Sequence, residues 1–130
     1  MLIDANIFLE VLLGQKKSKE CMKVLEEIKN GKEAYISTFT IDAIILVLHK
    51  HRTPLFKIAL FINSLLNYEG LIIYSVSMRD RLTAVKLMGK YAIDYEDAIT
   101  AQSAISAGCK FVLSMDSHFD KLKEIKRISP

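Results

Sequence analysis

The sequence has few of the residues that interrupt or cross-link a chain. Its 130 residues include two prolines, five glycines and two cysteines, and tryptophan is absent. So little proline and glycine excludes collagen-like and low-complexity chains, which are rich in both. Cys21 and Cys109 lie far apart, without CxxC or Cys/His spacing. We therefore interpret them as buried thiols of a reduced compartment, and not as a zinc site or a disulfide framework.

Long apolar runs are also missing. The most apolar segment, residues 55–74, contains Lys57, Asn63, Asn67 and Glu69 among its polar side chains. These interruptions argue against a membrane span. Asp4 and Glu10 fall too early for the uninterrupted apolar segment of a signal peptide. We therefore expect a cytoplasmic protein with no membrane partner.

Charge of one sign is only slightly in excess. The net charge is +3 and the sequence pI is near 8.8. This balance permits an anionic partner but falls short of the pI above about 9 that is typical of a dedicated nucleic-acid-binding domain. Hydrophobic residues make up 51% of a chain of ordinary domain length, which is enough to bury a core. We expect one globular domain over residues 1–130.

Short apolar runs alternate with periodic, polar-capped segments along the whole chain. The runs predict strands at residues 1–3, 34–36, 71–76 and 110–114, and a fifth if residues 126–129 also pair. The periodic segments predict helices at residues 6–13, 19–29, 38–50, 54–67, 77–88 and 94–108. Strands that alternate with helices indicate an α/β fold. We expect a three-layer α/β/α sandwich around a mainly parallel sheet of four to five strands.

Four aspartates occupy unusual places in this pattern. Asp4 and Asp116 are each the first acid after a predicted strand, so both are expected at the carboxyl-end rim of the sheet, where ligands bind. Asp42 and Asp97 lie near the starts of helices that can point toward the same rim. Carboxylates held close together are stable mainly when protonated or bound to a hard divalent cation. The pattern indicates metal-dependent phosphodiester chemistry.

Each aspartate also has a purely structural interpretation. Asp4 and Asp116 could cap the helices that follow them, and Asp97 could belong to a capping box that begins at Asp94. Asp42 is harder to explain in this way, because its neighbours are apolar and an unpaired buried carboxylate is costly. Asp42 is therefore the aspartate that we expect most strongly to have a functional role.

Four segments around these aspartates resemble, in order, the motifs of the PIN-domain ribonucleases, which include the VapC-type toxins of toxin–antitoxin pairs. Leu2-Ile3-Asp4-Ala5-Asn6 is similar to the first motif, an Asp at a strand end followed two residues later by Asn or Ser. Residues 36–42, 95–99 and 112–119 are similar to the second, third and fourth motifs. The resemblance extends from residue 2 to about residue 128, and four motifs in order are specific.

The resemblance implies a PIN-like fold and a metal-dependent endoribonuclease with RNA as its substrate. Carboxylate oxygens suit Mg²⁺ or Mn²⁺ as the cofactor. With two ions about 3.5–4 Å apart, one would activate a water and the other would stabilise the leaving oxygen. The implied metal-binding and catalytic acids are Asp4, Asp42, Asp97 and Asp116, and the implied neutral hydrogen-bonding or water-positioning residues are Asn6 and Ser114.

One position departs from the family pattern. The second acid is usually Glu, and Asp42 is one methylene shorter, a change that a water-mediated metal contact tolerates better than direct ligation. An inactive or weakly active PIN-like module that binds RNA or protein is therefore an alternative. A phosphoacceptor receiver domain is a more distant one, because it normally has paired acids where this chain has only Asp4. We interpret the nearby Asp94, Glu96 and Asp120 as capping or solvated residues.

Several basic groups could contact RNA phosphates. Residues 49–52 and the pair Arg79 and Arg81 are the candidates, although cations at a helix carboxyl end also interact favourably with the helix dipole. We interpret Lys121, Lys123, Lys126 and Arg127, and the lysines at 16, 17 and 19, as solvated. The sequence has no evident aromatic ladder for single-stranded RNA.

The predicted helix at residues 55–66 is apolar on nearly every side. Such a helix is buried on more than one face, whereas a sheet can cover only one. We therefore predict a homodimer joined largely through this helix, unless the helix around residues 82–88 covers the second face. The resemblance points the same way, because PIN-domain proteins commonly dimerise, and it adds an antitoxin protein as a second candidate partner.

Overall fold

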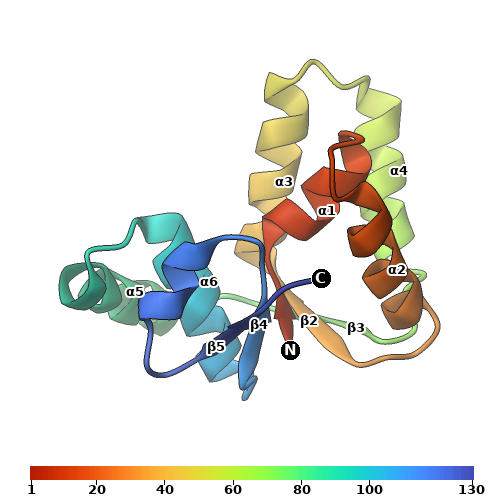
Figure 1. The fold of residues 1–130 in the computed structure, drawn as a ribbon. Helices are drawn as coiled ribbons and strands as arrows, with labels where there is room; N and C mark the ends of the chain where they lie inside the picture. The colour runs from red at the N-terminus through yellow and green to blue at the C-terminus, as the bar shows by residue number, and fades with distance from the viewer.

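The computed structural model describes residues 1–130 and contains one five-stranded sheet (Figure 1). Its strands are β1 (Leu2–Ile3), β2 (Ala34–Ser37), β3 (Leu71–Tyr74), β4 (Phe111–Leu113) and β5 (Lys126–Ile128). They lie in the order β3-β2-β1-β4-β5, and every neighbouring pair is parallel. The predicted parallel sheet is confirmed. The chain proceeds from β1 to β2 on one side and places β4 on the other, so a crevice is expected at the carboxyl ends of β1 and β4.

Six α-helices and one 3-10 helix surround the sheet. They are α1 (Ala5–Leu12), α2 (Ser18–Lys29), α3 (Thr38–Lys50), α4 (Leu55–Leu65), α5 (Met78–Tyr91), α6 (Tyr95–Ser106) and η1 (Ser117–Lys121). One buried cluster packs the helices α1, α2, α3 and α4 against the sheet. A second cluster packs α5, α6 and η1 against it. Ile3 belongs to the first cluster and Leu2 to the second, because successive strand residues point to opposite faces. The predicted α/β fold with helices on both faces is confirmed.

Two of the predicted helices begin at the serine residues that the sequence suggests as caps. The Ser37 hydroxyl accepts a hydrogen bond from the Thr40 amide at 3.0 Å at the start of α3. Ser77 and Asp80 form a complete capping box at the start of α5. The expected end of this helix near Gly89 is wrong, because α5 continues to Tyr91 and ends at Ala92, whose φ is 52°.

The added turn of α5 is held from outside the helix. Lys90 Nζ and the Tyr91 hydroxyl both donate to the Glu124 carboxylate, at 2.8 and 2.6 Å. Because Glu124 lies far along the chain, no local pattern could reveal this contact.

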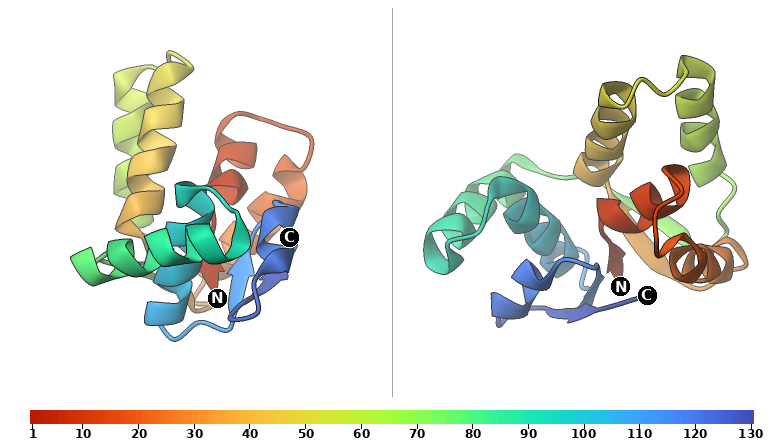
Figure 2. Two further views of the ribbon diagram at one scale, coloured as in Figure 1. Left: turned by 90° about the vertical axis from the view of Figure 1, so that its left-hand side faces the viewer. Right: turned by 45° about the horizontal axis from the view of Figure 1, so that its top comes forward.

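The helices α3 and α4 lie side by side and extend beyond the sheet (Figures 1 and 2). One face of α4 is buried, and Phe61 on that face contacts Phe8 with ring centroids 5.9 Å apart. Its other face is exposed and carries Leu55, Phe56 and Leu60. The alternative that α5 covers this face is wrong, since α5 lies on the other side of the sheet with α6. None of the helices is both long and apolar enough to cross a bilayer.

Candidate metal centre

Three of the four aspartates converge at the carboxyl-end rim of the sheet. Asp4 follows β1, Asp116 lies three residues beyond β4, and Asp97 is in the first turn of α6. They line one cavity of about 210 Å³ together with Asn6, Asp94 and Glu96. This cavity is called the acidic pocket below. The fold thus brings together residues separated by more than one hundred positions in the chain.

Asp4 is held by hydrogen bonds at both of its oxygens. Oδ1 accepts from the Ala5 amide at 2.7 Å, and Oδ2 accepts from Asn6 Nδ2 at 2.8 Å and from Ser114 Oγ at 2.7 Å. The residue is only 7% exposed, and this burial raises the pKa of Asp4 to about 6, although the Ser114 and Ala5 hydrogen bonds oppose the shift. A buried carboxylate whose ionisation is this costly is stabilised in its charged form by a cation.

Asn6 and Ser114 join the ends of β1 and β4. Asn6 Nδ2 also donates to Ser114 Oγ at 2.9 Å, and Asn6 Oδ1 accepts from the Met115 amide at 3.3 Å. Ser114 Oγ in turn accepts from the Asp116 amide at 2.9 Å. The two neutral residues therefore fix the position of Asp4 relative to Asp116.

His118 contacts two of the aspartates. Its Nδ1 lies 3.2 Å from Asp97 Oδ2 and 3.3 Å from Asp116 Oδ1. One ligand atom from each of these three residues lies within 4.8 Å of the other two. Burial raises the pKa of Asp97, the charges of Asp94 and Asp116 add to this shift, and His118 opposes it. The carboxylate oxygens fit Mg²⁺ or Mn²⁺, whereas an imidazole nitrogen is a ligand typical of Zn²⁺ and other transition metals.

Asp42 is not brought into the acidic pocket. It is exposed on α3 and lines a neighbouring pocket of about 240 Å³ with Phe39, Leu46 and Glu96. The expectation that Asp42 is buried among apolar residues was wrong. Thr40 and Ile44 face the core, and a position two residues from either lies about 200° around the helix.

Glu96 links the two pockets, because its side chain lines both. Burial raises the pKa of Glu96, and the charges of Asp94 and Asp116 contribute to the shift. From the sequence, Glu96 is interpreted as a solvated or capping residue, so its place at the pocket was missed. His118 was also missed, since the three histidines form no zinc pattern. The available signal was the position of His118 two residues after Asp116, within the fourth motif.

The capping interpretations of Asp4, Asp94 and Asp116 are correct, whereas the capping box that would include the Asp97 side chain is not formed. Asp4 caps α1, and Asp116 caps η1 by accepting from the His118 amide at 2.9 Å. Asp94 caps α6 by accepting from the Asp97 amide at 2.9 Å. The Asp97 carboxylate bonds to His118 at 3.2 Å. Caps at the strand ends thus hold the carboxylates at the rim.

Comparison with known families and structures extends over nearly the whole chain. The family model of the PIN domain matches residues 1–125. No curated protein matches the sequence.

The structural relatives are distant in sequence. VapBC2 from Rickettsia felis, bound to a DNA fragment from its promoter, is 14% identical at a TM-score of 0.76 and covers 98% of this chain and 96% of its own. A toxin–antitoxin complex from Klebsiella pneumoniae is 16% identical at a TM-score of 0.70, with 95% and 93% covered. The Mycobacterium tuberculosis toxin VapC20, described as cleaving the sarcin–ricin loop, is 10% identical at a TM-score of 0.76, with 92% of each chain covered. These likenesses establish a shared fold.

Proposed function

The chain belongs to the PIN-domain family, and from this premise we propose that it is a metal-dependent endoribonuclease that hydrolyses phosphodiester bonds in RNA. The observation that carries the proposal is the convergence of Asp4, Asp97 and Asp116 in one pocket at the carboxyl-end rim of the sheet. Two of these aspartates have a raised pKa, which is typical of functional carboxylates held close together.

The residues that would hold a divalent cation are Asp97 and Asp116, with His118 beside them and Asp4 deeper in the pocket. A bound Mg²⁺ or Mn²⁺ supplies a Lewis acid that lowers the pKa of water and offsets the charge of the phosphate. The charge of the carboxylates themselves would repel RNA, so the pocket suits a phosphodiester only together with a cation.

The remaining polar residues have supporting roles in this proposal. Ser114 keeps Asp4 oriented, and Asn6 lines the pocket, where its amide can orient a water or a phosphate oxygen. Glu96 supplies a further carboxylate at the pocket. Asp42, in the adjoining pocket, would act through intervening water, since it does not line the acidic pocket itself.

We further propose that the protein is the toxin of a toxin–antitoxin pair. The support is the likeness in fold to VapBC2 and to the toxin–antitoxin complex from Klebsiella pneumoniae. Its partners would then be the RNA substrate, an antitoxin protein and a second copy of this chain.

The test is cleavage of RNA by the purified protein in Mn²⁺, in Mg²⁺ and in EDTA, with Asp97→Asn as the variant and Asp120→Asn as the control. Asp120 is an exposed aspartate outside the acidic pocket and pairs with Arg127. We expect cleavage only with metal, retained in the control and reduced by more than about 100-fold in Asp97→Asn, which loses a carboxylate of the site itself. Equal rates in the variant and the wild type would contradict the proposal.

A binding module without catalysis is the second candidate. The observation that favours it is the exposed position of Asp42, which leaves the acidic pocket without the acid expected from the second motif. A protein that binds RNA yet does not cleave it in either metal would establish this alternative.

A further inference from the structure

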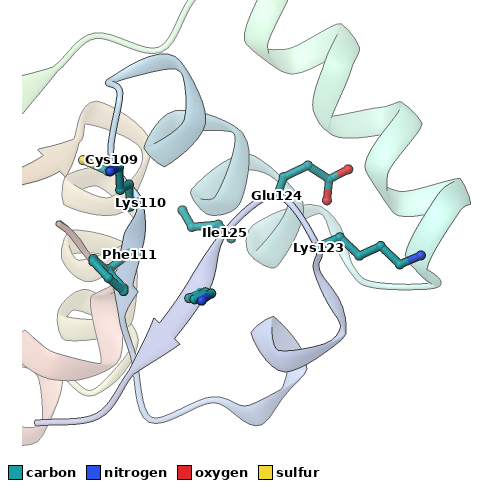
Figure 3. A pocket seen from close by; sticks show the side chains of 7 residues that line it. Cys109, Lys110, Phe111, Lys123, Glu124 and Ile125 are labelled. Carbon is teal, nitrogen blue, oxygen red and sulfur yellow. The ribbon is translucent and has the colours of Figure 1, made fainter.

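A larger pocket lies at the amino ends of β4 and β5, whereas the acidic pocket lies at the carboxyl ends of the strands (Figure 3). Its volume is about 280 Å³, against about 210 Å³ for the acidic pocket. Lys110, Phe111, Ile125 and Lys126 are among the residues that line it. It is called the lysine pocket below, and no acid of the proposed metal centre reaches it.

The lysine pocket has an aromatic surface that remains open to solvent. Phe111 is 39% exposed, whereas its strand neighbours Val112 and Leu113 are buried. Phe111 pairs in register with Lys126, so the two side chains project from the same face of the sheet. The strand β5 is an edge strand whose main neighbours are β4 and η1, and no α-helix is among them.

The charges at the lysine pocket are mostly positive and unpaired. Lys110, Lys123 and Lys126 line it, and none of the three has an ion-pair partner in the structure. The one carboxylate in the lining, Glu124, is already engaged by Lys90 and Tyr91 at 2.8 and 2.6 Å. Burial raises the pKa of the Cys109 thiol, so this group adds no negative charge at neutral pH.

The side chains are not equally placed. In Figure 3, Lys110 and Phe111 lie along β4, and Ile125 lies between the two strands. Lys123 and Glu124 extend from the segment before β5 and point away from β4. Lys126, the partner of Phe111 across the strands, is therefore the cation on the same face of the sheet as the ring, and Lys110, the preceding residue, lines the same pocket.

We propose that the lysine pocket binds single-stranded RNA, with a base stacked on Phe111 and phosphates contacted by Lys110 and Lys126. Stacking on an aromatic ring together with cations along the backbone is how proteins hold single strands without reading their sequence. The exposed ring favours RNA over an acidic peptide, whose carboxylates need cations but no stacking surface. This site goes beyond the proposed nuclease, because it gives the chain a second RNA contact remote from the acidic pocket.

The test is equilibrium binding of a short fluorescent single-stranded RNA in EDTA, measured by anisotropy with Asp97→Asn protein so that the RNA stays intact. Phe111→Leu keeps an apolar side chain but removes the ring, and should weaken binding by at least about fivefold. The double variant Lys110→Ala/Lys126→Ala should also bind more weakly, and the slope of log affinity against log salt should fall by about 1.4. The control is Lys16→Ala/Lys19→Ala, which removes the same charge from the exposed residues around the start of α2.

Each outcome decides the proposal. Equal binding by the Asp97→Asn protein alone and by the same protein with Phe111→Leu or with the double lysine change would overturn it. The lysines would then be charges that protect an edge strand from pairing. Polyglutamate is the probe for an acidic peptide. If the variants lose affinity for polyglutamate but not for RNA, the proposal is overturned in favour of an acidic peptide. Because binding is measured without metal, absence of cleavage by the wild-type protein would refute the proposed nuclease and leave this result intact.

Discussion

At the scale of the single residue, two aspartates of the acidic pocket combine a capping role with a place at the pocket. Asp4 and Asp116 cap helices, and both lie at the pocket with Asp97. A cap needs an acceptor at a helix start, and in a parallel sheet those starts follow the carboxyl ends of strands. The same position therefore suits a metal ligand, and a capping bond does not argue against a catalytic role.

Asp97→Asn should remove activity without unfolding the protein. The change keeps the shape of the side chain and deletes one of several repelling carboxylates, so metal-free stability should stay similar or rise. Urea unfolding in EDTA measures this effect. A marked loss of stability would indicate that Asp97 is mainly structural.

Asp4 should make the metal-free protein less stable as the pH rises. Its pKa in the fold is about 6, above the ordinary value of 3.8, so the fold favours the protonated form. The stability that protonation contributes is fully present below pH 3.8 and is lost as the pH rises through 6. A pKa that differs by about 2 between the folded and unfolded states corresponds to roughly 3 kcal/mol of unfolding free energy.

The measurement is the unfolding free energy between pH 4.5 and 7.5 in EDTA, compared between the wild type and Asp4→Asn. The comparison removes the contributions of Asp80 and Glu124, whose pKa values of about 2 give the opposite trend at lower pH. The difference between wild type and variant should change as the pH rises to about 6 and level off above it. A constant difference would show that Asp4 is ionised as easily as a surface carboxylate.

At the scale of the element, the end of α5 provides the sharpest test of the local structure. Ala92 has a left-handed φ of 52°, which costs an L-residue about 1–2 kcal/mol and glycine almost nothing. Ala92→Gly should therefore stabilise the protein by about 1 kcal/mol. Gly89 lies inside the helix with open space around its Cβ position, so Gly89→Ala should also stabilise it, by about 0.5–1 kcal/mol.

Chemical denaturation of both variants decides whether the carboxyl end of α5 lies at Gly89 or at Ala92. If α5 ended at Gly89, as its sequence suggests, Gly89→Ala would destabilise the protein instead. The structure predicts the longer helix, in which Lys90 and Tyr91 both contact Glu124.

The elements were largely predictable because most of their signals are local. Caps such as Ser37 and Ser77 and the alternation of apolar runs with periodic segments all act within a few residues. The end of α5 was not predictable, since it depends on Glu124 more than thirty residues away. The exposed position of Asp42 was also missed, although the helical phase of Thr40 and Ile44 already placed it opposite the core.

The candidate site was predictable to a similar degree. Motif order identified Asp4, Asp97 and Asp116, and strand topology brought them to one rim. The third and fourth motifs contain Glu96 and His118, but the motifs alone did not single them out, because their relevance comes from distances to residues on other elements.

At the scale of the whole molecule, the exposed face of α4 remains the basis for the proposed homodimer. Leu55, Phe56, Leu60 and Leu66 are between 62% and 74% exposed, and contiguous apolar surface of this kind usually marks an interface. Phe61, at the centre of the predicted interface segment, is buried against Phe8 and belongs to the core. A substitution at Phe61 would therefore test folding and not association.

Phe56→Lys/Leu60→Lys should convert a dimer to a monomer, because both side chains project from the exposed face of α4. Light scattering at micromolar concentration measures the mass. Leu82→Lys is the matched control, since Met78, Leu82 and Val85 form a separate exposed apolar patch on α5. A monomeric Leu82→Lys variant and a dimeric α4 variant would assign the interface to α5.

We propose that Asp4, Asp97 and Asp116 form a site for a divalent metal ion. Crystals of the protein soaked in Mn²⁺ test this proposal, because anomalous scattering locates the ion without regard to activity, RNA or oligomeric state. We predict an anomalous peak within ligand distance of Asp97 and Asp116, which is lost in Asp97→Asn crystals soaked in the same way. An empty acidic pocket in soaked wild-type crystals, or a peak that persists in the variant, would contradict the account.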